Sequence, residues 1–204
     1  MIGIIDYNAG NLQSVKNALE YVGANCEVIK DPNKLKNFDK IILPGVGAFG
    51  DAMEKLRSNG VDESIKEFIK SGKPFLGICL GMQLLFEKSY EFGENLGLGI
   101  IKGEVVKFDE NKFERKLKIP HVGWNAIKFT KSCKITKNLN DNVYFYFVHS
   151  YHVICKQEKC ILGKSEYGYE FVSAICKDNV MAFQPHPEKS HSNGLQIFKN
   201  FVEM

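Results

Sequence analysis

One cysteine of this chain lies between two glycines, in the run Gly77–Gly81 (GICLG). An apolar stretch, residues 75–78, precedes it and predicts a buried strand, while a helix is expected over residues 80–88. A nucleophile on such a sharp turn needs almost no side chain two positions to either side, which glycine provides. The pattern predicts that Cys79 is a nucleophile whose thiolate is favoured by the start of the helix. By itself, the run fits an ordinary buried cysteine equally well.

A histidine and a glutamate with the right spacing could serve this nucleophile. The segment His186–Glu188 (HPE) follows a predicted strand at residues 180–184. In an extended chain, side chains two positions apart point to the same side, so Glu188 can accept a hydrogen bond from one imidazole nitrogen. The other nitrogen can then take the proton of a thiol. We therefore expect Cys79, His186 and Glu188 to act as nucleophile, base and orienting carboxylate.

The remaining histidines offer no comparable arrangement. None of them is followed by a carboxylate that could orient the ring as Glu188 can orient His186. Together with Cys79 they also lack the spacing of paired metal ligands, so no metal site is predicted. These residues are His121, His149, His152 and His191.

A glycine-rich loop follows another predicted strand. Residues 40–43 are apolar, and Pro44–Gly47 (PGVG) comes directly after them. Glycines let a backbone N–H turn toward a reacting carbonyl without a clash, and such a loop can flip between competent and incompetent forms. Alone, the loop would be an ordinary connection between a strand and a helix. Beside Cys79, it becomes a candidate part of an oxyanion hole.

The order of the predicted elements indicates the fold class. Strand-like and helix-like segments alternate in the first half, and apolar strands without alternation indicate a buried parallel sheet. Strands are expected at residues 2–7, 26–29, 40–43 and 75–78, and helices at 12–22, 51–58, 62–71 and 80–88. The second half has short β segments at 104–108, 143–148, 153–155, 172–176 and 180–184, and a last helix at 192–202. We expect one α/β domain over residues 1–204, a three-layer flavodoxin-like sandwich with a mostly parallel, mixed sheet and additional antiparallel strands.

Composition narrows the classes of function. The formal net charge is +3 and the lysines are scattered, which predicts no binding to nucleic acid. No apolar run approaches the ~20 residues that a membrane span needs, and the first residues lack the pattern of a secretory signal, so the cytoplasm is expected. The six cysteines show neither a CxxC pair nor the density of a disulfide framework.

These segments together resemble the class I (triad) glutamine amidotransferases, and within them the glutaminase branch of imidazole glycerol phosphate synthase. The resemblance runs from end to end and rests on Ile4–Asn11, Pro44–Gly47, Gly77–Phe86, Pro120–Asn125, His149–His152 and His186–Ser190. The cysteine turn and the HPE segment are shared by the whole class. The PGVG loop, the GWN segment and the N-terminal AGN are typical of the histidine-pathway branch. Several sister glutaminases have PGG in place of the PGVG loop.

The resemblance implies a reaction and a set of site residues. Cys79 would attack the carboxamide carbon of L-glutamine, His186 would protonate the departing ammonia, and water would hydrolyse the glutamyl thioester. The oxyanion would be held by the Leu80 N–H and by an N–H of the loop, and no cofactor is implied. The substrate-binding residues would be Gly45, Val46, Gly47, Leu80, Gln83, Glu91, Ser150 and Tyr151.

The resemblance also implies a partner. Ammonia would pass to a (β/α)8-barrel cyclase subunit in a heterodimer, which forms imidazole glycerol phosphate. The docking face would include Asn11, Trp124, Tyr146 and Lys189. From residue type alone, the two aromatic side chains would be core residues and the lysine a solvated one. The branch usually has phenylalanine at position 185, where this chain has proline, and the loss of an N–H there puts the local packing in question.

Three other interpretations stay open at this level. The same glutaminase could supply ammonia to a different synthase, for example one that aminates a sugar in glycan biosynthesis. The chain could be a catalytically silent scaffold subunit, although the complete triad argues against this. It could also bind a phosphate group at the turn before the first helix, but it lacks both glycine-rich phosphate fingerprints.

Overall fold

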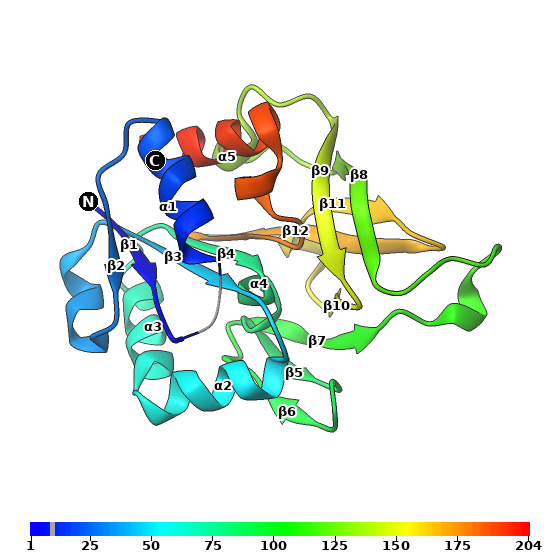
Figure 1. Cartoon of the computed structure of the whole chain (residues 1–204), viewed down its shortest axis with the longest axis horizontal. Helices are drawn as coiled ribbons and strands as arrows, with labels where there is room; N and C mark the ends of the chain where they lie inside the picture. Colours follow the sequence, from blue (N-terminus) through cyan, green and yellow to red (C-terminus); the bar gives the residue numbers. More distant parts are fainter. Residues whose placement is uncertain (9–10) are drawn as a thin grey trace.

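The computed structural model describes residues 1–8 and 11–204 (Figure 1). Residues 9 and 10, the middle of the predicted turn after the first strand, lie outside the described residues. None of the described helices is long and apolar enough to cross a membrane.

Five parallel strands form the centre of the sheet. They lie side by side in the order β2 (Cys26–Ile29), β1 (Ile2–Ile5), β3 (Lys40–Gly45), β4 (Phe75–Cys79) and β13 (Val180–Phe183). All residues of β1, β4 and β13 are buried. This is what strands with continuous apolar sequences predict, because helices cover both faces of such a sheet.

Helices cover the sheet on both sides. Figure 1 shows α1 (Leu12–Tyr21) and α5 (His191–Glu203) on one face, and α2 (Phe49–Ser58) and α3 (Val61–Lys70) on the other. Successive residues of β1 enter opposite layers of the core, since Ile4 packs in the cluster of α1 and α5 and Ile5 in that of α2 and α3. The predicted three-layer sandwich is confirmed.

Strands that pair antiparallel, apart from the parallel pair β5 and β7, extend this sheet. Next to β13 come β12 (Glu170–Lys177), β10 (Tyr151–Cys155), β7 (Ile101–Lys107), β5 (Phe86–Ser89) and β6 (Asn95–Leu96). A branch leaves β12 through β11 (Ile161–Glu166), β8 (His121–Phe129) and β9 (Asn142–His149). The short 3-10 helices are η1 (Pro32–Asn37), η2 (Glu110–Lys112), η3 (Lys134–Thr136), η4 (Glu158–Cys160) and η5 (Pro187–Lys189). The predicted mixed sheet is thereby confirmed.

The helix expected over residues 80–88 is wrong. The helix α4 covers only Leu80–Gln83, and the chain then enters β5. The carbonyls that would continue the helix bond elsewhere, since the Leu98 N–H donates to the Leu84 oxygen and the Ile100 N–H to the Leu85 oxygen, both at 2.9 Å. Tertiary partners therefore override the local helical pattern. The analysis of periodicity also missed β6, β8 and β11, which carry glycine or many polar residues.

The layer formed by α1 and α5 gives a test of the fold. Phe198 of α5 is fully buried, whereas Tyr21 at the end of α1 is 78% exposed. We expect Phe198→Ala to lower the free energy of unfolding by about 3–5 kcal/mol, because it removes a buried ring and leaves a cavity. Tyr21→Ala, the matched control, should change it by no more than about 0.5 kcal/mol. Urea denaturation measures both, and equal effects would contradict this packing.

Candidate active site

The turn that carries Cys79 is as tight as the glycine pattern predicts. Cys79 ends β4 with φ 54° and ψ −110°, a backbone conformation that residues other than glycine adopt only under strain. A Cβ on Gly81 would overlap the carbonyl oxygen of Leu43, and a Cβ on Gly77 would lie 2.9 Å from the Gly81 oxygen. Neither position has room for a side chain. The thiol is thus held at the end of a central strand by backbone packing on both sides of it.

The helix after Cys79 contributes less than expected. Because α4 has only four residues, few peptide dipoles add up at its start, and the predicted stabilisation of a thiolate by a helix is small here. The charged group that faces the sulfur is instead an imidazole. The main charged neighbour of the sulfur is therefore His186.

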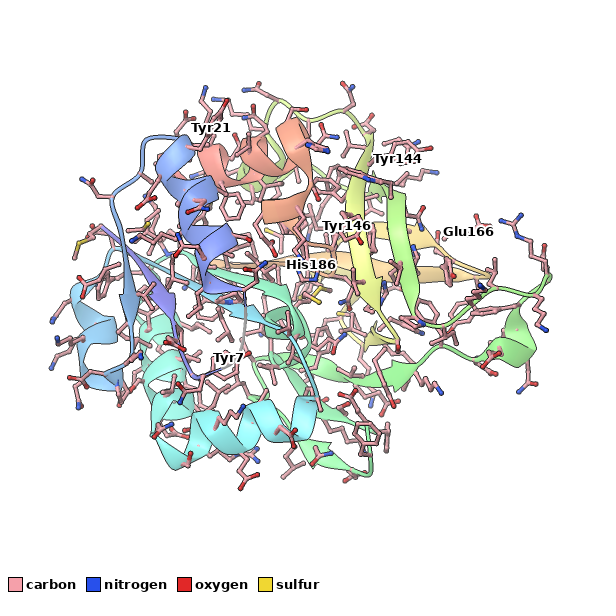
Figure 2. The ribbon with its side chains drawn as sticks, viewed as in Figure 1. Tyr7, Tyr21, Tyr144, Tyr146, Glu166 and His186 are labelled. Atoms are coloured by element: carbon pink, nitrogen blue, oxygen red, sulfur yellow. The ribbon has the colours of Figure 1, made fainter. Side chains whose placement is uncertain are left out.

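His186 and Glu188 form a buried pair. The Nδ1 atom of His186 lies 2.7 Å from Oε1 of Glu188, and their side chains are 5% and 2% exposed. The backbone around the ring is fixed, because the His186 N–H donates to the Tyr146 oxygen at 2.9 Å and the Ser190 hydroxyl donates to the His186 oxygen at 2.6 Å. Figure 2 shows Tyr146 and His186 close together at this point. The predicted contact between imidazole and carboxylate is present, and it leaves Nε2 for the sulfur.

The charge of His186 is set by its two neighbours. Burial alone would lower the pKa of this imidazole, but its interactions with Cys79 and Glu188 outweigh burial and raise that pKa to about 10. The ring is therefore protonated at neutral pH. A thiolate beside an imidazolium is the arrangement that activates a cysteine nucleophile.

Two glutamine side chains extend the environment of the sulfur. The Nε2 group of Gln184 lies 3.7 Å from Sγ of Cys79, and the oxygen of Gln184 accepts a hydrogen bond from Gln83 at 3.0 Å. Gln83 also donates to the Tyr151 oxygen at 3.0 Å, so its amide hydrogens are used within the protein and its oxygen is left to accept. The sequence analysis did not single out Gln184, although its place two residues before His186 was a signal.

A cavity of about 350 Å³ opens at Cys79 and is within the size range of small-molecule sites. Its walls combine the candidate nucleophile and base with residues from four other segments of the chain. They are Val46, Gly47, Cys79, Gln83, Glu91, Pro120, Val148, His149, Ser150, Tyr151, His186 and Lys189. Six of the eight predicted substrate-binding residues are among them. The other two, Gly45 and Leu80, are buried behind the wall, where Gly45 pairs with Cys79 in the register of β3 and β4.

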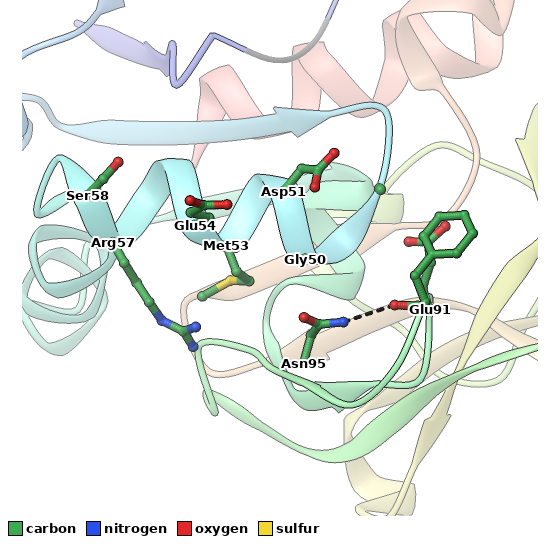
Figure 3. A pocket seen from close by; sticks show the side chains of 10 residues that line it. Gly50, Asp51, Met53, Glu54, Arg57, Ser58, Glu91 and Asn95 are labelled. Carbon is green, nitrogen blue, oxygen red and sulfur yellow. Dashed lines mark hydrogen bonds between the residues drawn. The ribbon is translucent and has the colours of Figure 1, made fainter.

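Glu91 lies between two hollows. One of its oxygens accepts a hydrogen bond from the Phe49 N–H at the start of α2, at 2.7 Å, and burial raises the pKa of the carboxyl. Glu91 also lines a second hollow, of about 610 Å³, between α2 and the turn closed by the bond from Asn95 to the Glu91 carbonyl (Figure 3). None of the described residues lining that hollow is cysteine or histidine. The hollow at Cys79 is the one equipped for chemistry.

Tyr7 is a buried neighbour of the site that the sequence analysis missed. Its side chain is 1% exposed, and its hydroxyl has no hydrogen-bond partner among the described residues. A Cβ on Gly45 would lie 2.5 Å from that hydroxyl. The ring therefore packs directly against the end of β3, where the glycine loop begins. Burial, and then the charge of Cys79, raise the pKa of Tyr7, which remains a neutral donor. No local pattern marks such a residue, because its contact is with a strand 38 positions away in the sequence.

Two neutral histidines position one wall of the cavity. The Nδ1 group of His149 bonds with the Tyr151 oxygen at 2.8 Å, and its Nε2 lies 3.0 Å from Nδ1 of His121. Burial lowers the pKa of His149 to about 3 and that of His121 to about 4. Both rings are neutral at neutral pH, so the bonds fix their tautomers and hold the Tyr151 backbone in place.

The four residues expected at a partner surface lie in different settings. Trp124 is 46% exposed, and its ring stacks on His191 at 5.1 Å and meets Tyr146 edge-on at 6.0 Å. The expectation of a core residue is therefore wrong for Trp124, while Tyr146 is half-buried. Lys189 is exposed at the edge of the cavity, and Asn11 directly precedes α1. Their role in docking stays a prediction.

Pro185 is accommodated without loss of backbone bonds. The residue is buried, and the N–H groups on both sides of it are satisfied. Gln184 donates to the Ser173 oxygen at 2.8 Å and His186 to the Tyr146 oxygen at 2.9 Å. The N–H that proline lacks is not one of those that hold the base in place.

Comparison with known proteins identifies the family. Residues 3–204 match the family model described as Glutamine amidotransferase class-I. The chain is 60% identical over 203 residues to the imidazole glycerol phosphate synthase subunit HisH of Sulfurimonas denitrificans, covering 100% of this chain and 98% of that protein. It is 57% identical over 204 residues to the HisH subunit of Wolinella succinogenes, covering all of both chains.

A solved structure supports the fold alone. PurLQS from Thermotoga maritima superposes with a TM-score of 0.79 at 19% identity, covering 99% of this chain and 97% of that one. The family model and the curated relatives both span essentially the whole chain. The chain is similar to HisH subunits over its whole length, and it belongs to the class I glutamine amidotransferase family.

Proposed function

We propose that this chain is the glutaminase subunit of an imidazole glycerol phosphate synthase and hydrolyses L-glutamine to glutamate and ammonia for histidine biosynthesis. One observation carries the proposal: a buried His186–Glu188 pair adjoins Cys79 in a single cavity. The full-length similarity to HisH subunits supports the choice of pathway.

The first half of the reaction uses the charges already present. The Cys79 thiolate attacks the carboxamide carbon, and the carbonyl electron pair moves onto the oxygen. As the tetrahedral intermediate collapses, the C–N bond breaks and the imidazolium of His186 gives its proton to the departing nitrogen. Ammonia leaves, and a glutamyl thioester remains on the sulfur.

The second half reverses the role of the imidazole. Neutral His186 takes a proton from a water molecule, whose oxygen attacks the thioester carbon. Glutamate departs and the thiolate is restored beside the imidazolium. Glu188 keeps the Nδ1 proton in place throughout, so that Nε2 alone exchanges protons. All groups needed for the chemistry are side chains of this protein, so the proposed reaction uses no cofactor.

The oxyanion is proposed to lie between two backbone donors, the Leu80 N–H and an N–H of the Val46–Gly47 segment. Gly47 has φ 95°, and both loop residues are exposed, so few contacts hold the peptide in one orientation. A loop of this kind can change orientation when a partner binds. We therefore propose that the isolated chain hydrolyses glutamine slowly.

The far end of the cavity is proposed to hold the amino-acid end of glutamine. The acceptor oxygens of Gln83 and Glu91 suit the α-ammonium group, because the donors of Gln83 are already used. Ser150 and Tyr151, which also line the cavity, are proposed to bind the α-carboxylate, so that the carboxamide of the substrate reaches Cys79.

The ammonia acceptor is proposed to be bound by a (β/α)8-barrel cyclase subunit in a heterodimer. The half-exposed Trp124 and the exposed Lys189 at the edge of the cavity support a docking face here, with Asn11 and Tyr146. We propose a cytoplasmic location, since all six cysteines are free thiols.

The nucleophile is tested by substitution. We expect Cys79→Ala to reduce glutamate formation to the uncatalysed background, because no other group can form the thioester. Cys26→Ala, a half-buried cysteine on β2, is the matched control and should retain activity. Glutamate release is measured in the presence of the cyclase. A Cys79→Ala protein that still hydrolyses glutamine would contradict the proposal.

The partner is tested by reconstitution. Adding the cyclase and its nucleotide substrate should raise the glutamine hydrolysis rate by about 5- to 150-fold, the range that corresponds to a coupling of 1–3 kcal/mol between sites. Trp124→Ala should weaken binding of the cyclase, measured by titration calorimetry, whereas substitution of another exposed aromatic residue, Tyr21→Ala on α1, should not. An unchanged hydrolysis rate would point to a different synthase as the partner.

The raised pKa of His186 predicts a pH dependence of stability. Below pH ~6.5 the ring is protonated in both the folded and the unfolded chain, and the full stabilisation is present. Between there and about pH 10 only the folded chain keeps the proton, so the free energy of unfolding falls as pH rises. The slope from this group is at most about 1.4 kcal/mol per pH unit.

This dependence is isolated by comparing the wild type with His186→Asn in urea denaturation. The difference in free energy of unfolding between the two proteins should shrink as pH rises through this window, because other titrating groups cancel. A difference that stays constant would show that His186 does not hold an extra proton in the folded state.

A further inference from the structure

Two cysteines outside the active site bring their sulfurs together from distant parts of the chain. Sγ of Cys133 and Sγ of Cys176 are 2.7 Å apart, although 43 positions separate them in the sequence. Cys133 lies directly before η3, and Cys176 lies near the end of β12. Both are free thiols and half-buried. Neither lines the cavity at Cys79, so the mechanism above does not use them.

The fold holds both cysteines by bonds that do not involve sulfur. The Thr136 hydroxyl donates to the Cys133 oxygen at 3.0 Å, and the Lys131 ammonium donates to the Cys176 oxygen at 3.2 Å. Farther along the same loop, the Asn200 amide of α5 donates to the Ile135 oxygen at 2.8 Å. The two backbones are therefore set near each other by the surrounding structure.

The pair is accessible to small molecules. Cys133 lines a surface hollow of about 670 Å³ that is formed by residues 129–141. This hollow is separate from the one at Cys79, with which it shares no residue. A small oxidant can thus reach one sulfur of the pair without entering the active site.

The contact biases the two thiols in opposite directions. Either sulfur can donate to the other, and the contact with Cys176 holds the pKa of Cys133 below its usual value, against the effect of burial and with help from the Ile135 N–H and Lys131. The same contact raises the pKa of Cys176. The pair thus favours a thiolate at Cys133 and a thiol at Cys176, the combination that a reactive cysteine and its resolving partner present. By contrast, burial raises the pKa of Cys26 and of Cys155.

We propose that Cys133 and Cys176 form a redox-sensitive site that closes to a disulfide when the protein meets hydrogen peroxide. The Cys133 thiolate attacks one peroxide oxygen, the O–O bond breaks, and a sulfenic acid and hydroxide form. Cys176 then attacks that sulfur, the S–O bond breaks, and the second oxygen leaves as water with the Cys176 proton. In balance, the two thiols lose two electrons and two protons, and hydrogen peroxide is reduced to two molecules of water.

The disulfide would connect two sides of the fold. It would join the loop before η3, which packs against α5, to the end of β12 in the central sheet. The closed loop runs from residue 133 to residue 176 and includes Ser150 and Tyr151 of the active-site wall. Closing a loop of this length restricts the unfolded chain, so oxidation should raise the melting temperature by roughly 5–10 °C.

The test is peptide mapping after oxidation. The reduced wild-type protein is treated with hydrogen peroxide, the remaining thiols are blocked with N-ethylmaleimide, and the digest is analysed by mass spectrometry. We expect a cross-linked peptide joining Cys133 to Cys176, with Cys26, Cys155 and Cys160 alkylated. The rise in melting temperature should accompany it and should be reversed by dithiothreitol.

Variants separate this site from the other thiols. Cys133→Ser and Cys176→Ser should lose both the cross-link and the rise in melting temperature, while Cys155→Ser, the matched control, should keep both. Oxidation of Cys133 to a sulfinic acid without a cross-link, or a cross-link elsewhere, would overturn the proposal. Because the readouts are a covalent bond and a melting temperature, these results are independent of the glutaminase assignment.

Discussion

The contact between the His186 ring and the Glu188 carboxylate, 2.7 Å long and almost fully buried, is the interaction on which the site depends. Removing either charge from water is costly, and the pair is tolerable only because each partner compensates the other. The second oxygen of Glu188 has no hydrogen-bond partner among the described residues, so the pair is not at its most stable arrangement. The cost lies in that unpartnered oxygen, whereas the charge on the ring is itself favoured in the folded chain.

The parallel sheet explains why these groups meet. In the register of the strands, Ile78 pairs with Phe183, and Cys79 pairs with Gly45. Three segments therefore leave the sheet together at the carboxyl ends of their strands: Cys79, the segment leading to His186, and the glycine loop. In folds of this kind, sites form at the carboxyl ends of parallel strands. Three segments far apart in the sequence need only short extensions to reach one cavity.

Local patterns predicted the parts of this site that depend on neighbouring residues. The glycines around Cys79 and the spacing of the HPE segment are properties of a few consecutive residues, and the structure has both. The helix expected after Gln83 failed because backbone partners from residues 98–101 replace it with a strand. Tyr7 and Gln184 escaped notice for the same reason, since only the sheet brings Tyr7 to Gly45 and Gln184 to the sulfur.

The cysteines of this chain differ in reactivity because different groups lie next to their sulfur atoms. Cys79 faces the charged imidazole of His186, and the two are proposed to act as nucleophile and proton carrier in the same cavity. Cys133 faces another thiol, which offers no proton relay but can complete a disulfide. Cys26 has burial as the leading influence on its thiol, and burial favours the neutral, unreactive form. The same side chain is thus a proposed nucleophile, a proposed redox centre or an inert packing group according to what the fold places beside it.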